Sequence, residues 1–340
     1  MRIGLLKEFN NCESRVAIVP NDIKKLKALD YEIYVESRAG ENALFHNEDY
    51  ASAGAVICER SRIFKLVDII VGIEAPQAKE IKKLQKFSTV VSVYPSSQNC
   101  CDILEKNELT YLSMNLMPRL SNLQNMDINS SQDMLGGYAA VYKAAEHLQK
   151  VIPLTITAAG SVPPAVFLVI GVGVFGMSAL STAKRLGASV YAYDINPKAA
   201  ELAKSVGAKF IDLSSKEAIE EFLPKVDVLI CSAFSHNKKA PIIISKEQLN
   251  LLPCGAIVVD AATEEGGNIE GSKIDGERAI NGITVFGYKN WAAKVPNSAS
   301  IMLSKNISNL ISEYFKSGRP DYTSEIIKEI CVCKNGRMSK

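Results

Sequence analysis

The chain has 340 residues, of which 47% are hydrophobic and 22% charged, and this composition excludes a disordered or fibrous protein. Its 39 basic and 37 acidic residues leave a net charge of +2, which removes the electrostatic case for a nucleic-acid-binding protein or a polybasic membrane-surface protein. We therefore expect small molecules or other proteins as partners. The length suits one large or two medium domains.

The first residues show no secretory signal, so we expect a cytoplasmic protein. One stretch, from Val151 to Ala183, has no Asp, Glu, Lys or Arg and is long enough to cross a bilayer. Prolines interrupt its first half and glycines its second, which favours a buried strand, turn and helix. We expect no segment of this chain to insert into a membrane.

The cysteines and histidines give little support for a metal site. The eight cysteines include no C-x-x-C pair, and the chain has only three histidines. Cys100 with Cys101, and Cys331 with Cys333, could form redox pairs. In a cytoplasmic chain, small buried or incidental thiols are the favoured interpretation.

Short apolar runs alternate with amphipathic helices in the first third of the chain. We expect strands at residues 2–6, 32–36, 67–73, 89–94 and 110–116, and helices at residues 21–28, 79–85 and 101–106. This alternation predicts βαβ units and a parallel sheet.

A second set of strands is expected at residues 167–170, 189–194, 209–211, 226–231, 256–260 and 284–286. Apolar residues recur at helical spacing over 127–150 and again over 299–315, so we expect two long helices to connect the sets. The predicted fold is α/β, with two Rossmann-like domains on parallel sheets, linked by long helices around a cleft. We place the N-terminal domain at 1–128 plus 311–340 and the second domain at 129–310.

A strand, a glycine motif and a helix follow one another between residues 166 and 186. The motif is G-x-G-x-x-G, with Gly171, Gly173 and Gly176, and this order is the context that a dinucleotide-binding site requires. Gly171 permits the tight turn, Gly173 lets the backbone approach a pyrophosphate, and Gly176 lets helix and strand pack closely. The next strand ends at Asp194, where an acid should meet the ribose hydroxyls.

Asp194 also bears on the choice of cofactor. Its carboxylate would repel a 2′-phosphate, and the following Ile195 and Asn196 offer no arginine, so NAD(H) is favoured over NADP(H). A glycine turn and a strand-end aspartate without any ligand are the alternative.

Further motifs resemble one family along nearly the whole chain. They are Lys7-Glu8, Glu13 to Ile18, Met117 to Ser121, Gln124 to Gln132, Thr157 to Ala165, Ala240-Pro241, Asp260, Glu265 to Asn268 and Phe286 to Tyr288. In this order they resemble the alanine dehydrogenase and NAD(P) transhydrogenase superfamily. The run from Met117 to Gln132 looks like the transhydrogenase version, that of the soluble, NAD(H)-binding domain of the proton-translocating transhydrogenase alpha subunit.

The resemblance implies that Arg119, Gln124, Asp127 and Ser130 surround the nicotinamide and its ribose, with the first three as the catalytic group. Arg119 and Asp127 can form an ion pair, and Ser130 can hydrogen-bond the carboxamide. Gln124 can bridge ribose hydroxyls of the donor and acceptor cofactors. Hydride transfer between two nicotinamides needs no acid or base, so the protein contributes position.

The resemblance also implies cofactors, partners and further site residues. The implied protein passes hydride from NADH to NADP⁺ held on another subunit, coupled to proton translocation by membrane subunits. It would be a homodimer, peripheral to the inner membrane through transmembrane and NADP-binding partner subunits. The cofactor-binding residues would be Arg119, Gln124, Asp127, Ser130, Gly171, Gly173, Val174, Phe175, Gly176, Asp194, Ala233, Glu265 and Gly266.

Two alternatives stay open. An alanine dehydrogenase-type enzyme would oxidise an amino acid with NAD, and Arg15 matches that family's substrate arginine. The family's substrate lysine is replaced by Glu74, and the strand at 90–95 has no catalytic histidine, since His46, His147 and His236 all lie elsewhere. The other alternative is a non-catalytic NAD(H)-binding subunit, because residues 210–227 leave little room for the family's mobile lid loop.

Overall fold

The computed structural model describes residues 1–10, 12–93, 101–235, 238–274 and 276–338. The chain forms two compact units, Met1–Gln132 with Pro296–Lys340, and Asp133–Val295. The sequence analysis places the domain boundaries after residues 128 and 310, and these boundaries stay a prediction.

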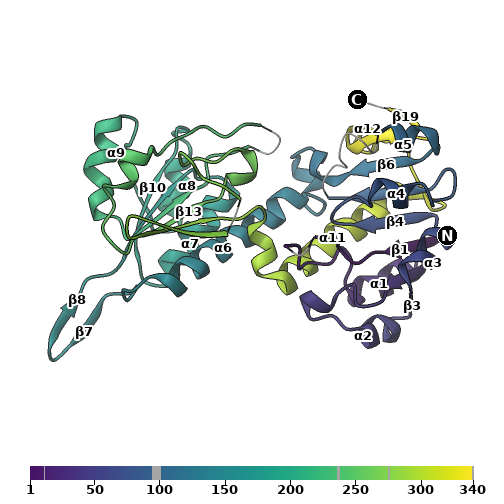
Figure 1. The fold of residues 1–340 in the computed structure, drawn as a ribbon, viewed down its shortest axis with the longest axis horizontal. Helices are drawn as coiled ribbons and strands as arrows, with labels where there is room; N and C mark the ends of the chain where they lie inside the picture. Colours follow the sequence, from purple (N-terminus) through teal and green to yellow (C-terminus); the bar gives the residue numbers. More distant parts are fainter. Residues whose placement is uncertain (11, 94–100, 236–237, 275, 339–340) are drawn as a thin grey trace. The chain divides into compact units, whose positions relative to one another are not determined.

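The first unit is built on an eight-stranded sheet (Figure 1). Six strands are parallel and run in the order β3-β2-β1-β4-β5-β6. Numbered along the chain, this is the order 3-2-1-4-5-6 of a Rossmann sheet. The strands are β1 (Arg2–Leu5), β2 (Glu32–Glu36), β3 (Val56–Cys58), β4 (Ile69–Gly72), β5 (Thr89–Ser92), β6 (Thr110–Ser113), and the antiparallel β18 (Cys331–Lys334) and β19 (Arg337–Met338) beside β6.

Helices cover both faces of this sheet, which is why β4 and β5 are buried along their whole length. The long helix α11 (Pro296–Tyr314) contributes Leu303, Ile307 and Leu310, at helical spacing, to the core beneath β1 and β4. The other helices are α1 (Pro20–Lys27), α2 (Asn47–Ser52), α3 (Arg60–Leu66), α4 (Ala78–Ile81), α5 (Cys101–Lys106) and α12 (Glu325–Ile330), with 3₁₀ turns η1 (Glu41–Ala43), η3 (Met114–Leu116) and η4 (Ser121–Leu123).

The second unit has a seven-stranded sheet in the order β11-β10-β9-β12-β13-β15-β14, so its six parallel strands again follow the Rossmann order. Its strands are β9 (Val166–Ile170), β10 (Ser189–Tyr193), β11 (Lys209–Phe210), β12 (Val228–Cys231), β13 (Ile257–Asp260), β15 (Ile283–Gly287) and the antiparallel β14 (Gly276–Ile280).

The buried strand expected in the long stretch without charges is β9, but residues 151–164 at the start of that stretch are exposed or half-buried, so this part of the expectation is wrong. Phe167 and Val169 point into one hydrophobic core, whereas Leu168 and Ile170 point into the core on the other face. A strand covered on both faces is apolar throughout. No helix in the part of the chain that the structure describes is long and apolar enough to cross a bilayer.

The helices of the second unit carry the chain between these strands. They are α7 (Val174–Arg185), α8 (Ala199–Ser205), α9 (Lys216–Phe222) and α10 (Lys246–Leu249), with 3₁₀ turns η5 (Leu223–Lys225), η6 (Thr263–Glu265) and η7 (Trp291–Lys294). The helix α6 (Ile128–His147) starts in the first unit and continues into the second. A hairpin of β7 (Thr155–Thr157) and β8 (Gly160–Val162) extends away from the sheet of this unit (Figure 1).

The structure confirms the α/β class and the Rossmann-like character of both sheets, and it corrects several details. Neither sheet is purely parallel, because β14 pairs antiparallel with β15, β18 with β6, and β19 with β18. The strand expected at 110–116 ends at Ser113, and its apolar tail forms η3 instead. The helix expected to follow the glycine motif begins within it, at Val174, directly after Gly173. Tyr94, the expected end of β5, lies outside the described residues.

Candidate functional site

The strand order of the second unit reverses between β9 and β12. In open α/β sheets, ligands bind in the crevice at the carboxyl ends of the strands at such a switch point. The glycine motif follows β9, and Ser232 and Ala233 follow β12. The topology therefore brings the glycine motif and Ala233, both predicted to bind the cofactor, to the carboxyl ends of two neighbouring strands.

Each glycine of the motif has a distinct steric environment. Gly171 has φ of +94°, and a Cβ on it would lie 2.6 Å from the carbonyl of Ser232. A Cβ on Gly176 would lie 1.9 Å from the carbonyl oxygen of Gly171. Any residue other than glycine at position 176 would therefore push the helix away from the strand. At Gly173 a Cβ would meet nothing within 4 Å. This open space is where a pyrophosphate can approach the backbone.

The first turn of α7 presents its amino end beside this space. Gly173 is the N-cap residue, so no side chain caps the helix, and the positive end of its dipole faces the opening. Val174 is partly exposed, whereas Phe175 is buried and makes edge-to-face contacts with Phe234 and Trp291. The aromatic contacts hold the turn while its amide groups stay available for an anion.

Asp194 lies directly after β10 and fastens the glycine loop. Its Oδ2 accepts a hydrogen bond from the Val172 amide at 2.7 Å, and its Oδ1 accepts one from the Asn196 amide at 2.7 Å. Each carboxylate oxygen retains a lone pair, so the side chain can still accept from ribose hydroxyls. The geometry is compatible with the ribose-binding role expected from the sequence.

The turn after β12 is fastened by residues for which the sequence predicts no role. Ser232 donates through Oγ to the carbonyl oxygen of Gly171 at 2.9 Å. The fully buried Asn268 accepts from the Ala233 amide at 3.0 Å and donates to the Ala233 carbonyl at 2.9 Å. Asn268 follows Glu265 and Gly266, whose backbone leads from η6 into this pairing. Its burial within a polar loop has no signal in the sequence.

Asp260 anchors the same loop from the end of β13. Its carboxylate accepts from the backbone amides of Ala262, Asn268 and Ile269 at 3.0–3.2 Å. Burial raises the pKa of this carboxyl, although the three amides act in the opposite direction. Trp291, to which the sequence assigns no role, is buried and donates through Nε1 to the Asp260 carbonyl at 3.5 Å.

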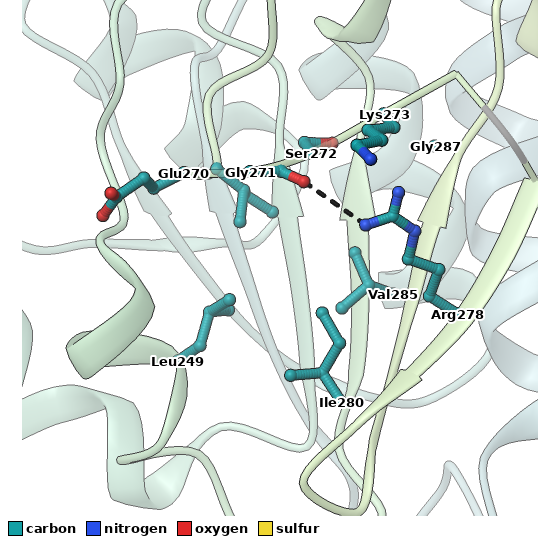
Figure 2. A pocket seen from close by; sticks show the side chains of 10 residues that line it. Leu249, Glu270, Gly271, Ser272, Lys273, Arg278, Ile280, Val285 and Gly287 are labelled. Atoms are coloured by element: carbon teal, nitrogen blue, oxygen red, sulfur yellow. Dashed lines mark hydrogen bonds between the residues drawn. The ribbon is translucent and has the colours of Figure 1, made fainter.

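A small cavity in this unit is not the nucleotide site. It lies between β14, β15 and the segment from Glu270 to Lys273, and Arg278 donates to the Gly271 carbonyl at its rim (Figure 2). Its volume is about 10 Å³, which accommodates about one water molecule.

The residues expected near the nicotinamide all lie in the first unit, around the start of α6. Asp127 precedes this helix, and its carboxylate accepts from the Ser130 amide at 3.0 Å and from the Ser130 hydroxyl at 2.6 Å. This is the geometry of a helix N-cap. Gln124 is exposed at the end of η4, and Arg119 is exposed in the loop before it. The ion pair expected between Arg119 and Asp127 stays a prediction.

The first unit also has a switch point, between β1 and β4, but a carboxyl group occupies it. Glu8 accepts from the amides of Ile73 at 2.7 Å and Glu74 at 3.1 Å. Burial raises the pKa of Glu8 to about 8, and the charges of Glu13 and Glu74 act in the same direction. This edge has no glycine loop, so it offers no comparable place for a pyrophosphate.

Arg15 is enclosed at the same edge by its own partners. It is 1% exposed and makes a two-point ion pair with Glu13, with nitrogen–oxygen distances of 2.8 and 2.7 Å. A third hydrogen bond, of 2.6 Å, goes to Oε1 of Gln132. A carboxylate substrate would have to displace Glu13, so this arginine is poorly suited to bind one.

The histidines and cysteines weighed from the sequence lie outside the glycine turn and the group around Glu8, where the structure describes them. His147 ends α6 in the second unit, where its ring packs edge-to-face on Phe286, and His236 lies outside the described residues. Cys331 and Cys333 are buried, and their thiols donate to the carbonyl oxygens of Cys333 and Leu109, respectively. Cys100 also falls outside the described part of the chain. Among the described residues, no group of three or more His, Cys, Asp or Glu side chains is arranged to hold a metal ion.

Comparison with known proteins gives a consistent result. Residues 4–135 match the description "Alanine dehydrogenase/PNT, N-terminal domain", and residues 140–340 match its C-terminal domain. The chain is 32% identical to a Rhodospirillum rubrum protein that constitutes the first portion of an NAD(P) transhydrogenase subunit alpha, covering 99% of this chain and 97% of that protein.

Two further relatives agree. The chain is 31% identical to NAD(P) transhydrogenase subunit alpha of Cereibacter sphaeroides, of which it spans 65%. The crystal structure of transhydrogenase from Sinorhizobium meliloti superimposes with a TM-score of 0.92 at 33% identity, covering 99% of this chain and 98% of that one.

The glycine motif yields a matched pair of substitutions. Gly173→Ala adds a methyl group in open space, so we expect an almost unchanged melting temperature but about tenfold or more weaker NADH binding. Gly176→Ala forces a methyl group against the Gly171 carbonyl and should lower the free energy of unfolding by about 1–3 kcal/mol. Calorimetry and NADH fluorescence titration measure both quantities. Unchanged NADH affinity in Gly173→Ala would contradict the placement of the pyrophosphate.

Glu8 predicts a pH dependence of stability. Its folded-state pKa of about 8 lies above the ordinary value of 4.5, so its contribution is complete below about 4.5 and is lost as the pH rises through 8. Between pH 5 and 9 we expect the melting temperature of the wild type to fall by at least about 2 °C relative to Glu8→Gln. The exposed Glu48→Gln serves as control, and parallel curves for all three proteins would refute the prediction.

Proposed function

Because the chain belongs to the alanine dehydrogenase/PNT family, we propose that it is the NAD(H)-binding subunit of a proton-translocating NAD(P) transhydrogenase. The observation that carries the proposal is the strand, glycine turn and helix at the switch point, with open space at Gly173. The similarity to the R. rubrum protein over almost the full length of both chains supports it.

The residues present fit NAD(H). The amino end of α7 receives the pyrophosphate, because Gly173 leaves room for it and the helix dipole favours its charge. Asp194 accepts from the adenosine ribose and disfavours a 2′-phosphate, which makes NADH the preferred ligand. Ala233, Glu265 and Gly266 line the adjoining turns at the ends of β12 and β13.

In the proposed reaction NADH supplies the hydride, and NADP⁺ on a partner subunit accepts it. The contribution of this chain is positional, because close approach and orientation of two nicotinamides replace acid–base chemistry. Asp127 holds Ser130 at the start of α6, which fixes the hydroxyl that would bind the carboxamide. The exposed Gln124 is free to reach ribose hydroxyls, and Arg119 accompanies it in the same loop.

Proton translocation requires other chains. The described helices include none that could span a bilayer, so in this proposal separate membrane subunits move the protons. The chain would then be peripheral to the inner membrane and active only with its NADP-binding and transmembrane partners.

A homodimer is included in the proposal, and exposed apolar side chains support it. On the hairpin β7–β8, Ile156 is 73% exposed, and Val162 is also exposed. Along α6, Met134, Tyr138 and Tyr142 recur every four residues and are all exposed. Apolar side chains gathered on an arm and a helix face of one unit are typical of a surface that a second copy covers.

A non-catalytic NAD(H)-binding subunit is the second candidate, and the connection from β11 to β12 favours it. This connection consists of α9, η5 and short turns, with α9 capped by Ser215 and Phe222 packed on Tyr191. The alignment with the R. rubrum relative spans 372 positions, so that relative has internal residues that this 340-residue chain lacks. The alanine dehydrogenase alternative is weaker, because Glu13 neutralises Arg15.

Hydride exchange distinguishes the two candidates. We mix the chain with an NADP-binding transhydrogenase subunit and follow reduction of an NAD analogue by NADPH. Turnover supports the transhydrogenase, whereas tight NADH binding without turnover supports the non-catalytic subunit. Gln124→Asn should slow exchange by about tenfold or more while NADH affinity stays within about twofold, because the shorter amide no longer reaches the ribose hydroxyls.

The matched control is Asn125→Gln, an exchange of the same two amides at the next position, where the side chain donates to Glu313 at 2.8 Å. This variant should retain the wild-type rate. If Gln124→Asn also retained it, Gln124 would have no part in the reaction.

The dimer is tested at the hairpin. Ile156→Asp places a charge in the proposed interface and should convert the dimer into monomers in sedimentation velocity, without lowering NADH affinity. Asn250→Asp is the control, because it adds a charge at an exposed position of the same unit outside the hairpin and keeps the oxygen that accepts from Asn281. A wild-type chain that sediments as a monomer at all concentrations would contradict the proposed assembly.

A further inference from the structure

The glycine turn at Gly171 is held from a neighbouring strand by a buried hydroxyl. Ser232 is 5% exposed, and its Oγ donates to the Gly171 carbonyl oxygen at 2.9 Å. The same serine places its backbone against Gly171, because a Cβ there would lie 2.6 Å from the Ser232 carbonyl. Ser232 therefore determines both the orientation of the Gly171 peptide and the closest approach of its backbone.

Ala233, which follows Ser232, is held by the side chain of Asn268, which bonds both the amide and the carbonyl of Ala233 as a neighbouring β-strand would. Its side chain exchanges two hydrogen bonds with the Ala233 backbone and donates a third, of 2.9 Å, to the Pro241 carbonyl. These three bonds use both donors and one acceptor site of the amide. Because Asn268 is fully buried, removing it would leave the Ala233 amide and two carbonyl groups without partners.

The anchor of this arrangement is the end of β13. The Asp260 carboxylate accepts from the backbone amide of Asn268, and the Asn268 carbonyl accepts from the amides of Ile243 at 2.7 Å and Ile244 at 3.1 Å. The Asn268 backbone is thus fixed from two sides before its side chain meets Ala233. A continuous chain of hydrogen bonds leads from Asp260 through Asn268 to the turn that abuts Gly171.

We propose that Ser232 and Asn268 are positioning residues of the nucleotide site: Ser232 acts through Gly171, and Asn268 acts through Ala233. The inference rests on the proposed binding of NAD(H). Neither side chain needs to touch the dinucleotide, since both determine where the backbone of the glycine turn lies. Displacing such a turn by a fraction of an ångström weakens every bond between its amides and the pyrophosphate.

Ser232→Ala is the first test, since it removes only the hydroxyl, with its bond to the Gly171 carbonyl and a longer one of 3.5 Å to the Ile170 carbonyl, and leaves no bulky gap. We expect NADH affinity to fall about five- to tenfold, with the loss mainly in faster dissociation measured by stopped-flow fluorescence. Ser232→Thr keeps the hydroxyl and should retain an affinity closer to that of the wild type. The control is Ser304→Ala, which removes a buried hydroxyl bonded to Asp22 in the first unit and should lower the melting temperature without changing NADH affinity.

The outcomes separate this inference from the proposed function. A wild-type chain that binds no NADH refutes the proposed function itself. A wild-type chain that binds NADH, together with a Ser232→Ala variant of equal affinity and lowered melting temperature, overturns the positioning role, because Ser232 would then serve stability alone.

Asn268→Ala tests the second residue against Asn297→Ala, in which the lost amide bonds the Ala43 carbonyl in the first unit. We expect Asn268→Ala to weaken NADH binding by more than about tenfold at temperatures well below its melting point, and Asn297→Ala to have no such effect. If both residues act on the same turn, the Ser232/Asn268 double variant loses less affinity than the product of the single losses. Strictly multiplicative losses would refute a shared target.

Discussion

The nucleotide site depends on the close approach of the first turn of α7 to the end of β9. The carbonyl oxygen of Gly171 occupies the space that any side chain on Gly176 would need, so helix and strand share a contact that only glycine allows. A second contact that only glycine allows lies on the opposite side of the turn, since a Cβ on Gly137 of α6 would lie 2.2 Å from the Phe175 carbonyl. The amino end of α7 is therefore fixed by backbone contacts on two sides, and its polar partners refine a position that sterics already impose.

The two units have the same strand order but differ in the loops at the point where that order reverses. Both follow the Rossmann order, and in both the order of the strands along the sheet reverses beside the first strand. In the second unit this edge has a glycine turn with open space at Gly173. In the first unit Glu8 accepts the amides at the end of β4, and Glu13 neutralises Arg15. Function here is decided by the loops after the strands, not by the sheet.

Local pattern in the sequence suffices to predict β9, the glycine motif and Asp194, because they are near neighbours in the chain and periodicity and glycine geometry identify them. Ser232 and Asn268 cannot be found in this way, because their partners lie 61 and 35 residues away and a buried serine or asparagine has the same letter as an exposed one. The antiparallel edges formed by β14, β18 and β19 are hidden for the same reason, since their pairing depends on long-range register. The prolines before β9 indicate only a break in regular structure, and the hairpin β7–β8 that forms there has no further signal.

Under the proposed function, the short connection from β11 to β12 leaves the exclusion of water from the reacting nicotinamides to another chain. Leu223 is fully buried within it, and Phe222 packs on Tyr191, so these side chains anchor the segment to the hydrophobic core. Hydride transfer between two nicotinamides requires that water is excluded from the site. Enzymes usually exclude it by closing a loop or domain over the bound substrate. Under the proposed function, the partner that carries NADP⁺ then has to exclude the water itself. The nicotinamides then lose their water only when the partner subunit binds, so the rate of hydride exchange is sensitive to the contact between the subunits. In the isolated chain, NADH binds and dissociates without this step.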